Sequence, residues 1–197
     1  MKSLLLLGVL TYLAASINFS IILFKILGQG DPRDRFSGNA GTSNVSRQLG
    51  KFWGALILLL DVGRAVAVAQ IGVWYLPGPW VPLLGLILVI GNQRPLFHGF
   101  RGGKGVAGYL GFTAFLSPFT AGISCLSWVM AFALFRVTFI SSFFMIAVLG
   151  GGIIVKFPWD PLAAITAVLT IALIIGAHKT NIRTFQKKRM ARENSEG

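Results

Sequence analysis

The chain has 197 residues, of which 54% are hydrophobic, 18 are Lys or Arg and 6 are Asp or Glu, giving a net charge of +12. A mean hydropathy of +0.72 excludes an ordinary soluble domain and indicates an integral membrane protein. The basic residues lie in short connections between apolar runs rather than on one helical face, which argues against a nucleic-acid partner and favours a bias toward cytoplasmic loops.

The first apolar segment runs from about residue 4 to residue 27. Lys2, the apolar run and the small residues at 14–16 are also typical of a cleavable secretory signal. Because the apolar stretch continues to Leu27, which is about the length of a bilayer crossing, we expect it to be retained as a span.

A polar loop follows, and between residues 35 and 47 it reads Arg-Phe-Ser-Gly-Asn-Ala-Gly-Thr-Ser-Asn-Val-Ser-Arg. Small hydroxyl and amide side chains, two glycines and a closing arginine can surround an oxyanion with side-chain and backbone donors. The same composition is typical of ordinary turns, so this segment alone leaves both interpretations open.

The second apolar segment, at about 52–76, contains Asp61 and Arg64, three residues apart on one helical face. Charges at such depth are costly, so they pair with one another or face a cavity. The sequence leaves a structural ion pair and a binding role as equal alternatives.

The third apolar segment, at about 80–97, overlaps the most unusual stretch, which runs from Gly91 to Gly108. It reads Gly-Asn-Gln-Arg-Pro-Leu-Phe-His-Gly-Phe-Arg-Gly-Gly-Lys-Gly-Val-Ala-Gly. Glycines let backbone N–H groups approach a ligand closely, and a lysine among them adds a point positive charge. The stretch therefore predicts a site for phosphate or another compact anion, although glycine-rich basic turns also occur as plain loops.

Between Val106 and Phe135 the chain carries no charge. As one straight helix this run would be about 45 Å long, too long for a single crossing. Ser117-Pro118 predicts a break near its middle. Cys125, the only cysteine, lies within this run, so we expect neither a disulfide framework nor a cysteine-based metal site.

Two further apolar segments, at about 139–157 and 161–177, precede a basic tail that begins after His178. Ser141 and Ser142 enter the first of them, where serines commonly serve helix packing. His178 and Asn181 stand three residues apart at the end of the second, and a lone histidine there is ordinarily an interfacial side chain.

Charge decides the topology, because the tail and the loop after the first span are both basic and should both face the cytoplasm. Only a break at Pro118 allows this. We therefore predict an all-α integral membrane protein with seven transmembrane helices, the N-terminus outside and the C-terminus cytoplasmic. Residues 1–185 form a single seven-helix membrane domain, and residues 186–197 form a basic cytoplasmic tail.

Three motifs, in this order and between these spans, resemble the bacterial acyl-phosphate:glycerol-3-phosphate acyltransferase family, PlsY. They are Ser-Gly-Asn-x-Gly from Ser37, with Asn44 and Arg47 behind it; Pro-x-Phe-x-x-Phe-x-Gly-Gly-Lys-Gly-Val-Ala from Pro95; and His-x-x-Asn-Ile from His178. The resemblance covers the chain from Tyr12 to Arg183, and with it residues 1–185 are expected to be an acyltransferase-like domain.

The resemblance implies a multi-pass enzyme of the bacterial inner (plasma) membrane with its active site facing the cytoplasm. The family moves a fatty acyl group from acyl phosphate to the 1-hydroxyl of sn-glycerol 3-phosphate, giving lysophosphatidate and phosphate in the first step of phospholipid synthesis. It implies acyl phosphate and glycerol 3-phosphate as substrates and neither a cofactor nor a metal. We expect a monomer in the lipid bilayer.

By resemblance, the residues expected to act in catalysis are Lys104, Ser37, Arg47, Asn181 and His178. Those expected to bind the phosphate or the acceptor are Gly38, Asn39, Gly41, Asn44, Gly102, Gly103, Gly105, Ser141, Asp61 and Arg64. Charge stabilisation of a departing phosphate by this set would let the acceptor hydroxyl attack directly, without a covalent protein intermediate.

The chain departs from the family pattern at Asn92, where the family has histidine, and at Thr184, where it has arginine; Arg64 and Gly108 also replace the usual residues. We do not expect His98 to replace the missing histidine. These departures keep three alternatives open: a different hydroxylated acceptor, a non-catalytic protein that binds acyl phosphate, and an anion transporter.

Overall fold

The computed structural model describes residues 2–196, and within them every regular element is helical. The α-helices are α1 (Lys2–Ser16), α2 (Phe19–Ile26), α3 (Thr42–Leu49), α4 (Lys51–Tyr75), α5 (Val81–Gln93), α6 (Val106–Leu116), α7 (Pro118–Phe135), α8 (Thr138–Lys156), α9 (Pro161–Ala177) and α10 (Lys179–Glu196). The 3₁₀ helices are η1 (Pro32–Asp34), η2 (Gly78–Trp80) and η3 (Leu96–His98).

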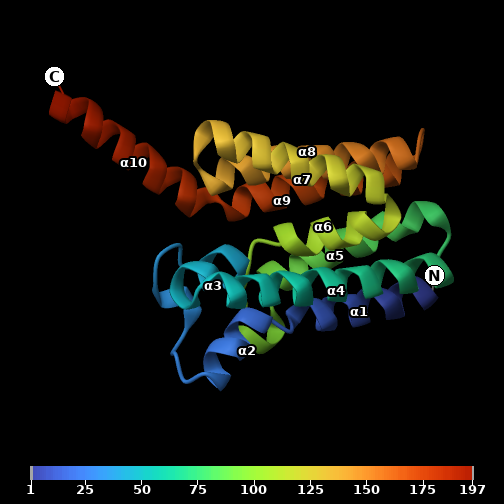
Figure 1. Ribbon diagram of the computed structural model, residues 1–197. Helices are drawn as coiled ribbons and strands as arrows, with labels where there is room; N and C mark the ends of the chain where they lie inside the picture. Colours follow the sequence, from blue (N-terminus) through green and yellow to red (C-terminus); the bar gives the residue numbers. More distant parts are fainter. Residues whose placement is uncertain (1, 197) are drawn as a thin grey trace.

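The long helices lie side by side and alternate in direction, as Figure 1 shows. The connections that follow α2, α5, α7 and α9 all lie at one end of the bundle, and α10 extends away from that end. The N-terminus and the connections that follow α4, α6 and α8 lie at the other end. The basic connections are therefore gathered at one end.

The predicted break between α6 and α7 is confirmed. α6 ends at Leu116, and α7 begins at Pro118. Proline suits the first turn of a helix because its missing N–H would have no partner inside the helix there.

By length and composition, five helical segments of the described chain can cross a membrane: Lys2–Ile26, Lys51–Tyr75, Gly78–His98, Pro118–Phe135 and Thr138–Lys156. α9 and α10 meet at 45° and make a sixth if they form one broken span. α6 has 11 residues, which is short for a crossing. The all-helical membrane architecture is thus confirmed, whereas the count of seven and the orientation stay predictions.

The first predicted span is present as the segment Lys2–Ile26, and within it α1 and α2 are separate helices that meet at Ile17–Asn18. The Asn18 side chain caps α2 by accepting a hydrogen bond from the Ile21 N–H at 3.1 Å. Arg64 of α4 donates from Nη1 to the Ile17 carbonyl at the break. Such donors make an interruption tolerable in an apolar segment, because the end of α1 leaves carbonyls without helical partners.

Two groups of buried apolar side chains hold α5 in place. One joins α5 to α1, α4 and α6 and includes Leu84, Leu88 and Phe112. The other joins α5 and α6 to α8 and α9 and includes Val89 and Ile174. α5 and α9 are consequently packed as fixed neighbours, and these two helices line the cleft described next.

Candidate functional site

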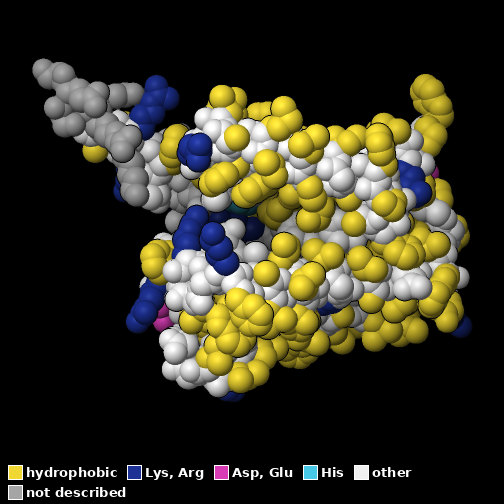
Figure 2. Space-filling view, viewed as in Figure 1, with side chains coloured by type: hydrophobic (Ala, Val, Ile, Leu, Met, Phe, Trp, Pro, Cys, Tyr) yellow, Lys and Arg dark blue, Asp and Glu magenta, His cyan; other side chains and the backbone are white. Residues whose placement is uncertain are grey.

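A cleft of about 570 Å³ opens at the end of the bundle where the basic connections lie. Figure 2 shows this face hollowed between the two halves of the molecule, with Lys and Arg side chains beside the hollow. We call residues 31–41 the first loop and residues 94–105 the glycine loop. The polar lining residues are Arg33, Ser37, Gly38, Asn39, Gln93, Arg94, Arg101, Gly102, Gly103, Lys104, Thr180 and Asn181. The remaining lining residues are Ile90, Leu169, Ala172, Leu173, Gly176 and Ala177.

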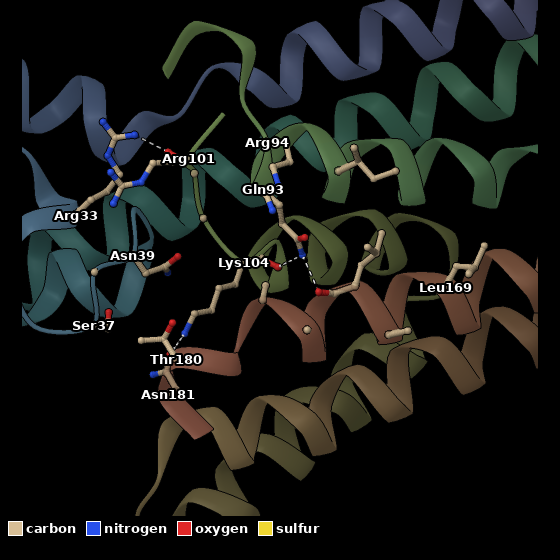
Figure 3. Close-up of a pocket in the computed structure, with 18 residues that line it drawn as sticks. Arg33, Ser37, Asn39, Gln93, Arg94, Arg101, Lys104, Leu169, Thr180 and Asn181 are labelled. Carbon is tan, nitrogen blue, oxygen red and sulfur yellow. Dashed lines mark hydrogen bonds between the residues drawn. The ribbon is translucent and has the colours of Figure 1, made fainter. Parts of the chain in front are cut away.

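Lys104 extends from the glycine loop across the cleft toward the start of α10, where its Nζ donates a hydrogen bond to Asn181 Oδ1 (Figure 3). Burial of the ammonium group, together with the positive charge of Arg47, lowers the pKa of Lys104 to about 8. Among the side chains that the structure describes, which are those of residues 2–187 and 189–191, no carboxylate forms an ion pair with Lys104. A partly buried cation without a counter-charge favours an anionic ligand.

The glycine loop returns along the end of α5. The Gly103 N–H donates to the Asn92 carbonyl at 3.0 Å, and the Gly102 N–H donates to the Gln93 carbonyl at 3.2 Å. A Cβ at Gly103 would lie 2.5 Å from Asn92 Oδ1 and 2.9 Å from the Ala40 carbonyl oxygen. Only glycine allows the loop to come this close to both α5 and the first loop.

Gln93 joins the glycine loop to α9. Its Nε2 donates to the Lys104 carbonyl at 3.0 Å and to the Leu173 carbonyl at 3.2 Å (Figure 3). The backbone of Lys104 is thereby held between α5 and α9. α6 begins immediately afterwards, with Gly105 as its N-cap in the left-handed region at φ +87°.

Asn44, fully buried at the start of α3, shapes the first loop from behind. Its Nδ2 donates to the Pro32 carbonyl at 2.7 Å and to the Asn39 carbonyl at 2.9 Å. Its Oδ1 accepts a hydrogen bond from the Ser37 N–H at 3.4 Å. Asn44 therefore presents Ser37 and Asn39 to the cleft without lining it.

The structure brings seven of the sequence-predicted site residues into the cleft lining, and they come from the first loop, the glycine loop and α10. They are Ser37, Gly38, Asn39, Gly102, Gly103, Lys104 and Asn181. Arg47 lies outside the lining and is exposed, and it donates to Thr138 Oγ1 at 3.3 Å. Its charge nevertheless acts on Lys104.

Other predicted residues lie behind the lining. Ser141 is fully buried, and its hydroxyl donates to the Val137 carbonyl at 3.1 Å within α8. His178 is 3% exposed, and its Nδ1 lies 2.7 Å from the Ile174 carbonyl oxygen. Because a carbonyl only accepts, Nδ1 carries the proton, and Nε2 of the neutral ring remains an acceptor. Gly41 is the N-cap of α3 and, like Gly105, is absent from the lining.

Asp61 and Arg64 also lie outside the cleft lining. Arg64 Nη2 donates to Asp61 Oδ1 at 2.8 Å, and both side chains are about nine-tenths buried. Arg64 also donates to the Ala14 and Ala15 carbonyls, each at 3.4 Å, and lies 5.0 Å from the centre of the Phe19 ring. Of the two alternatives from the sequence, the geometry supports the structural ion pair.

Sequence reasoning did not assign Arg33, Gln93 or Thr180 to the site. For Gln93 the available signal was an amide at the end of an apolar helix. For Arg33 it was an arginine two residues after Asp31.

The departures from the family pattern at Asn92 and Thr184 lie outside the cleft lining. Asn92 is 5% exposed beneath the glycine loop, and Thr184 is exposed on α10.

Comparisons with known proteins agree with this arrangement. The family model described as glycerol-3-phosphate acyltransferase matches residues 5–188. A glycerol-3-phosphate acyltransferase of Anaeromyxobacter sp. (strain Fw109-5) is 34% identical, over 91% of this chain and 92% of the relative. One from Pseudomonas paraeruginosa (strain DSM 24068 / PA7) is also 34% identical, over 90% of this chain and 93% of the relative.

Two solved structures share the fold. The crystal structure of the integral membrane glycerol 3-phosphate acyltransferase PlsY in its glycerol 3-phosphate form matches with a TM-score of 0.87 at 34% identity, over 95% of this chain and 94% of that one. The lysophosphatidic acid form matches with a TM-score of 0.84 at 33% identity, over 95% of this chain and 93% of that one.

Proposed function

The chain belongs to the glycerol-3-phosphate acyltransferase family, and from that premise we propose that it transfers a fatty acyl group from acyl phosphate to the 1-hydroxyl of sn-glycerol 3-phosphate. The products are lysophosphatidate and inorganic phosphate. One observation carries the proposal most directly: a single cleft joins Lys104, which pairs with no carboxylate among the described side chains, to an apolar wall from α5 and α9. An acyl phosphate has a matching pair of parts, an anionic phosphate and an apolar acyl chain.

The polar end of the cleft suits the phosphate. Lys104, the Asn181 amide and the Ser37 hydroxyl can donate to phosphate oxygens. α3 and α6 begin beside the first loop and the glycine loop, and the positive end of a helix dipole favours an anion. Arg47 adds positive charge from outside the lining.

The reaction requires no covalent protein intermediate. The acceptor hydroxyl oxygen attacks the acyl carbonyl carbon, the bond between that carbon and the phosphate oxygen breaks, and phosphate leaves with the electron pair. The hydroxyl proton passes to the leaving phosphate. Donors that are already fixed in place stabilise the charge that grows on the phosphate, which is the main contribution that the protein can make to an activated mixed anhydride.

The apolar wall suits the acyl chain. Ile90 of α5 and Leu169, Ala172 and Leu173 of α9 line the part of the cleft away from Asn181. Figure 3 shows Leu169 at the opposite side of the cleft from Lys104 and Asn181. Burial of each methylene group there would stabilise binding by about 0.8 kcal/mol.

We further propose a monomer in the bacterial inner membrane, with seven crossings, the N-terminus outside, and the C-terminus and active site on the cytoplasmic side. The support is the collection of basic connections at one end of the bundle. Membrane-impermeant thiol labelling of single cysteines placed in the tail and at Gly78 tests the orientation, after replacement of Cys125. Labelling of position 78 but not of the tail in intact cells is expected, and the reverse pattern would contradict it.

Purified protein in detergent or proteoliposomes tests the activity. Given acyl phosphate and glycerol 3-phosphate, it should release phosphate and form lysophosphatidate in equal amounts. A folded preparation that hydrolyses or binds acyl phosphate but forms no lysophosphatidate would overturn the proposed acceptor. A panel of other hydroxylated acceptors would then identify the alternative.

A further inference from the structure

We propose that Arg33 is a positioning residue that holds the first loop and the glycine loop at the spacing that phosphate binding requires. This inference rests on the proposed function for its kinetic consequences, but not for its structural test. Arg33 belongs to none of the three motifs that carry the family resemblance.

Arg33 reaches from the first loop to the backbone of the glycine loop. Its Nη1 donates to the His98 carbonyl at 2.9 Å and to the Arg101 carbonyl at 2.6 Å. Figure 3 shows the Arg33 side chain directed toward Arg101. One guanidinium nitrogen thus serves both sides of the turn that immediately precedes Gly102 and Gly103.

The turn between these two carbonyls has an uncommon backbone. Gly99 has φ +64° and Phe100 has φ +56°, so two successive residues adopt the left-handed region, one of them bulky. A non-glycine residue in that region costs energy and persists only when its surroundings determine it. The two hydrogen bonds from Arg33 supply such a constraint.

Asp31 holds the guanidinium in place. Its carboxylate accepts from Arg33 Nε at 2.8 and 3.0 Å and from Nη2 at 2.5 Å. The pKa of Asp31 is lowered, mainly by this hydrogen bonding. Because Asp31 occupies Nε and Nη2, Nη1 is directed at the glycine loop in a fixed geometry.

The same segment is attached to α3. The Pro32 carbonyl accepts hydrogen bonds from Asn44 Nδ2 at 2.7 Å and from Gln48 Nε2 at 2.9 Å. A continuous series of contacts therefore runs from α3 through Pro32 and Arg33 to the turn before Lys104. Displacement of the turn by about 1 Å would cost roughly 100-fold in rate, because donors must meet the phosphate in the correct geometry.

The experiment compares Arg33→Gln with Arg35→Gln. Arg35 lies in the same loop and is exposed, and its removal takes away the same charge without breaking a bond to the glycine loop. Two further variants separate the effect of the Arg33 charge from that of its hydrogen-bond geometry. Arg33→Lys keeps the positive charge but loses the planar guanidinium. Asp31→Asn keeps a capping side chain at position 31 but removes the negative charge that pairs with Arg33.

The first measurement is hydrogen exchange of the backbone amides at residues 99–103, which needs no catalysis. Faster exchange is expected in Arg33→Gln, an intermediate rate in Arg33→Lys and Asp31→Asn, and the wild-type rate in Arg35→Gln. Equal exchange in Arg33→Gln and the wild type would overturn the inference. This outcome is independent of whether the wild-type protein transfers acyl groups, so failure of the proposed function is recognised separately.

The second measurement is the pH profile of kcat/KM. For Arg33→Gln we expect a fall of about 100-fold, against about twofold for Arg35→Gln. We also expect the alkaline limb to move upward from about pH 8 toward 10.5, because a loosened loop exposes Lys104 to water. A lower Tm with an unchanged kcat/KM and pH profile would mean that Arg33 only stabilises the fold.

Discussion

Lys104 and Asn181 are 77 positions apart in the chain, and the Nζ of the first donates a hydrogen bond to the Oδ1 of the second. This bond joins the glycine loop to the start of α10 across the polar end of the cleft. It orients an ammonium group that forms no ion pair with a carboxylate in the part of the chain whose side chains are described. Both side chains are thereby placed where a phosphate can accept hydrogen bonds from them.

Lys104→Ala should lower kcat by about 100- to 1,000-fold, because it removes a donor from the position where charge develops. Phosphate release from acyl phosphate in the presence of glycerol 3-phosphate measures the effect. Lys51→Ala is the matched control, since Lys51 is exposed at the start of α4. Full activity of a folded Lys104→Ala protein would remove Lys104 from the phosphate site.

The kcat/KM of the wild-type protein should fall as the pH rises above about 8. A lysine carries its charge below its pKa, and burial together with Arg47 lowers the pKa of Lys104 to about 8. The charge is therefore present at lower pH and lost through this range. In Lys104→Arg the decline should disappear, whatever the absolute rate, because a guanidinium stays protonated. An identical decline in both proteins would assign the titration to another group.

Gly176→Leu should discriminate against long acyl chains. Gly176 lines the cleft, and a Cβ at this position would meet nothing within 4 Å, so the leucine would enter the cleft. Displacement of two methylene groups, at about 0.8 kcal/mol each, would lower kcat/KM for a long-chain acyl phosphate roughly 15-fold. Butyryl phosphate should be affected much less.

Gly122→Leu provides the control for that change. Gly122 is exposed on α7, and a Cβ there also meets nothing within 4 Å, but the residue does not line the cleft. Its chain-length profile should match that of the wild type. If Gly176→Leu lowers the rates of short and long donors equally, the acyl chain does not occupy this wall.

Arg64→Met should destabilise the protein by about 3–5 kcal/mol, because Asp61 would remain buried without its partner. Thermal unfolding in detergent measures this change, and the double variant with Asp61→Asn should recover part of the loss. The KM for glycerol 3-phosphate should be unchanged in the folded fraction. An increased KM at unchanged Tm would instead support the binding role predicted from the sequence.

The membrane class, the break at Pro118 and the three motifs were predictable because they depend on local composition and spacing. Seven predicted residues from those motifs line the cleft, whereas Arg47 and His178 from the same motifs lie outside the lining. The interruption at Ile17–Asn18 is stabilised by the local Asn18 cap and by Arg64, and the contact with Arg64 was not predictable because that residue is 47 positions away from Ile17 in the chain. Likewise, an isolated sequence gives no sign that Gln93 will contact α9, because the contact depends on helix packing.

By itself the sequence determined that the chain is a helical membrane protein with glycine-rich and hydroxyl-rich loops suited to an anion, since hydropathy, glycine content and charge placement are local properties. Tertiary structure decided which of these residues meet. It placed Lys104 beside Asn181, used Arg64 at a helix end rather than in the cleft, and directed Arg33 to the glycine loop. The physical reason is that a hydrogen bond between distant residues forms only where the packing of whole helices brings donor and acceptor together.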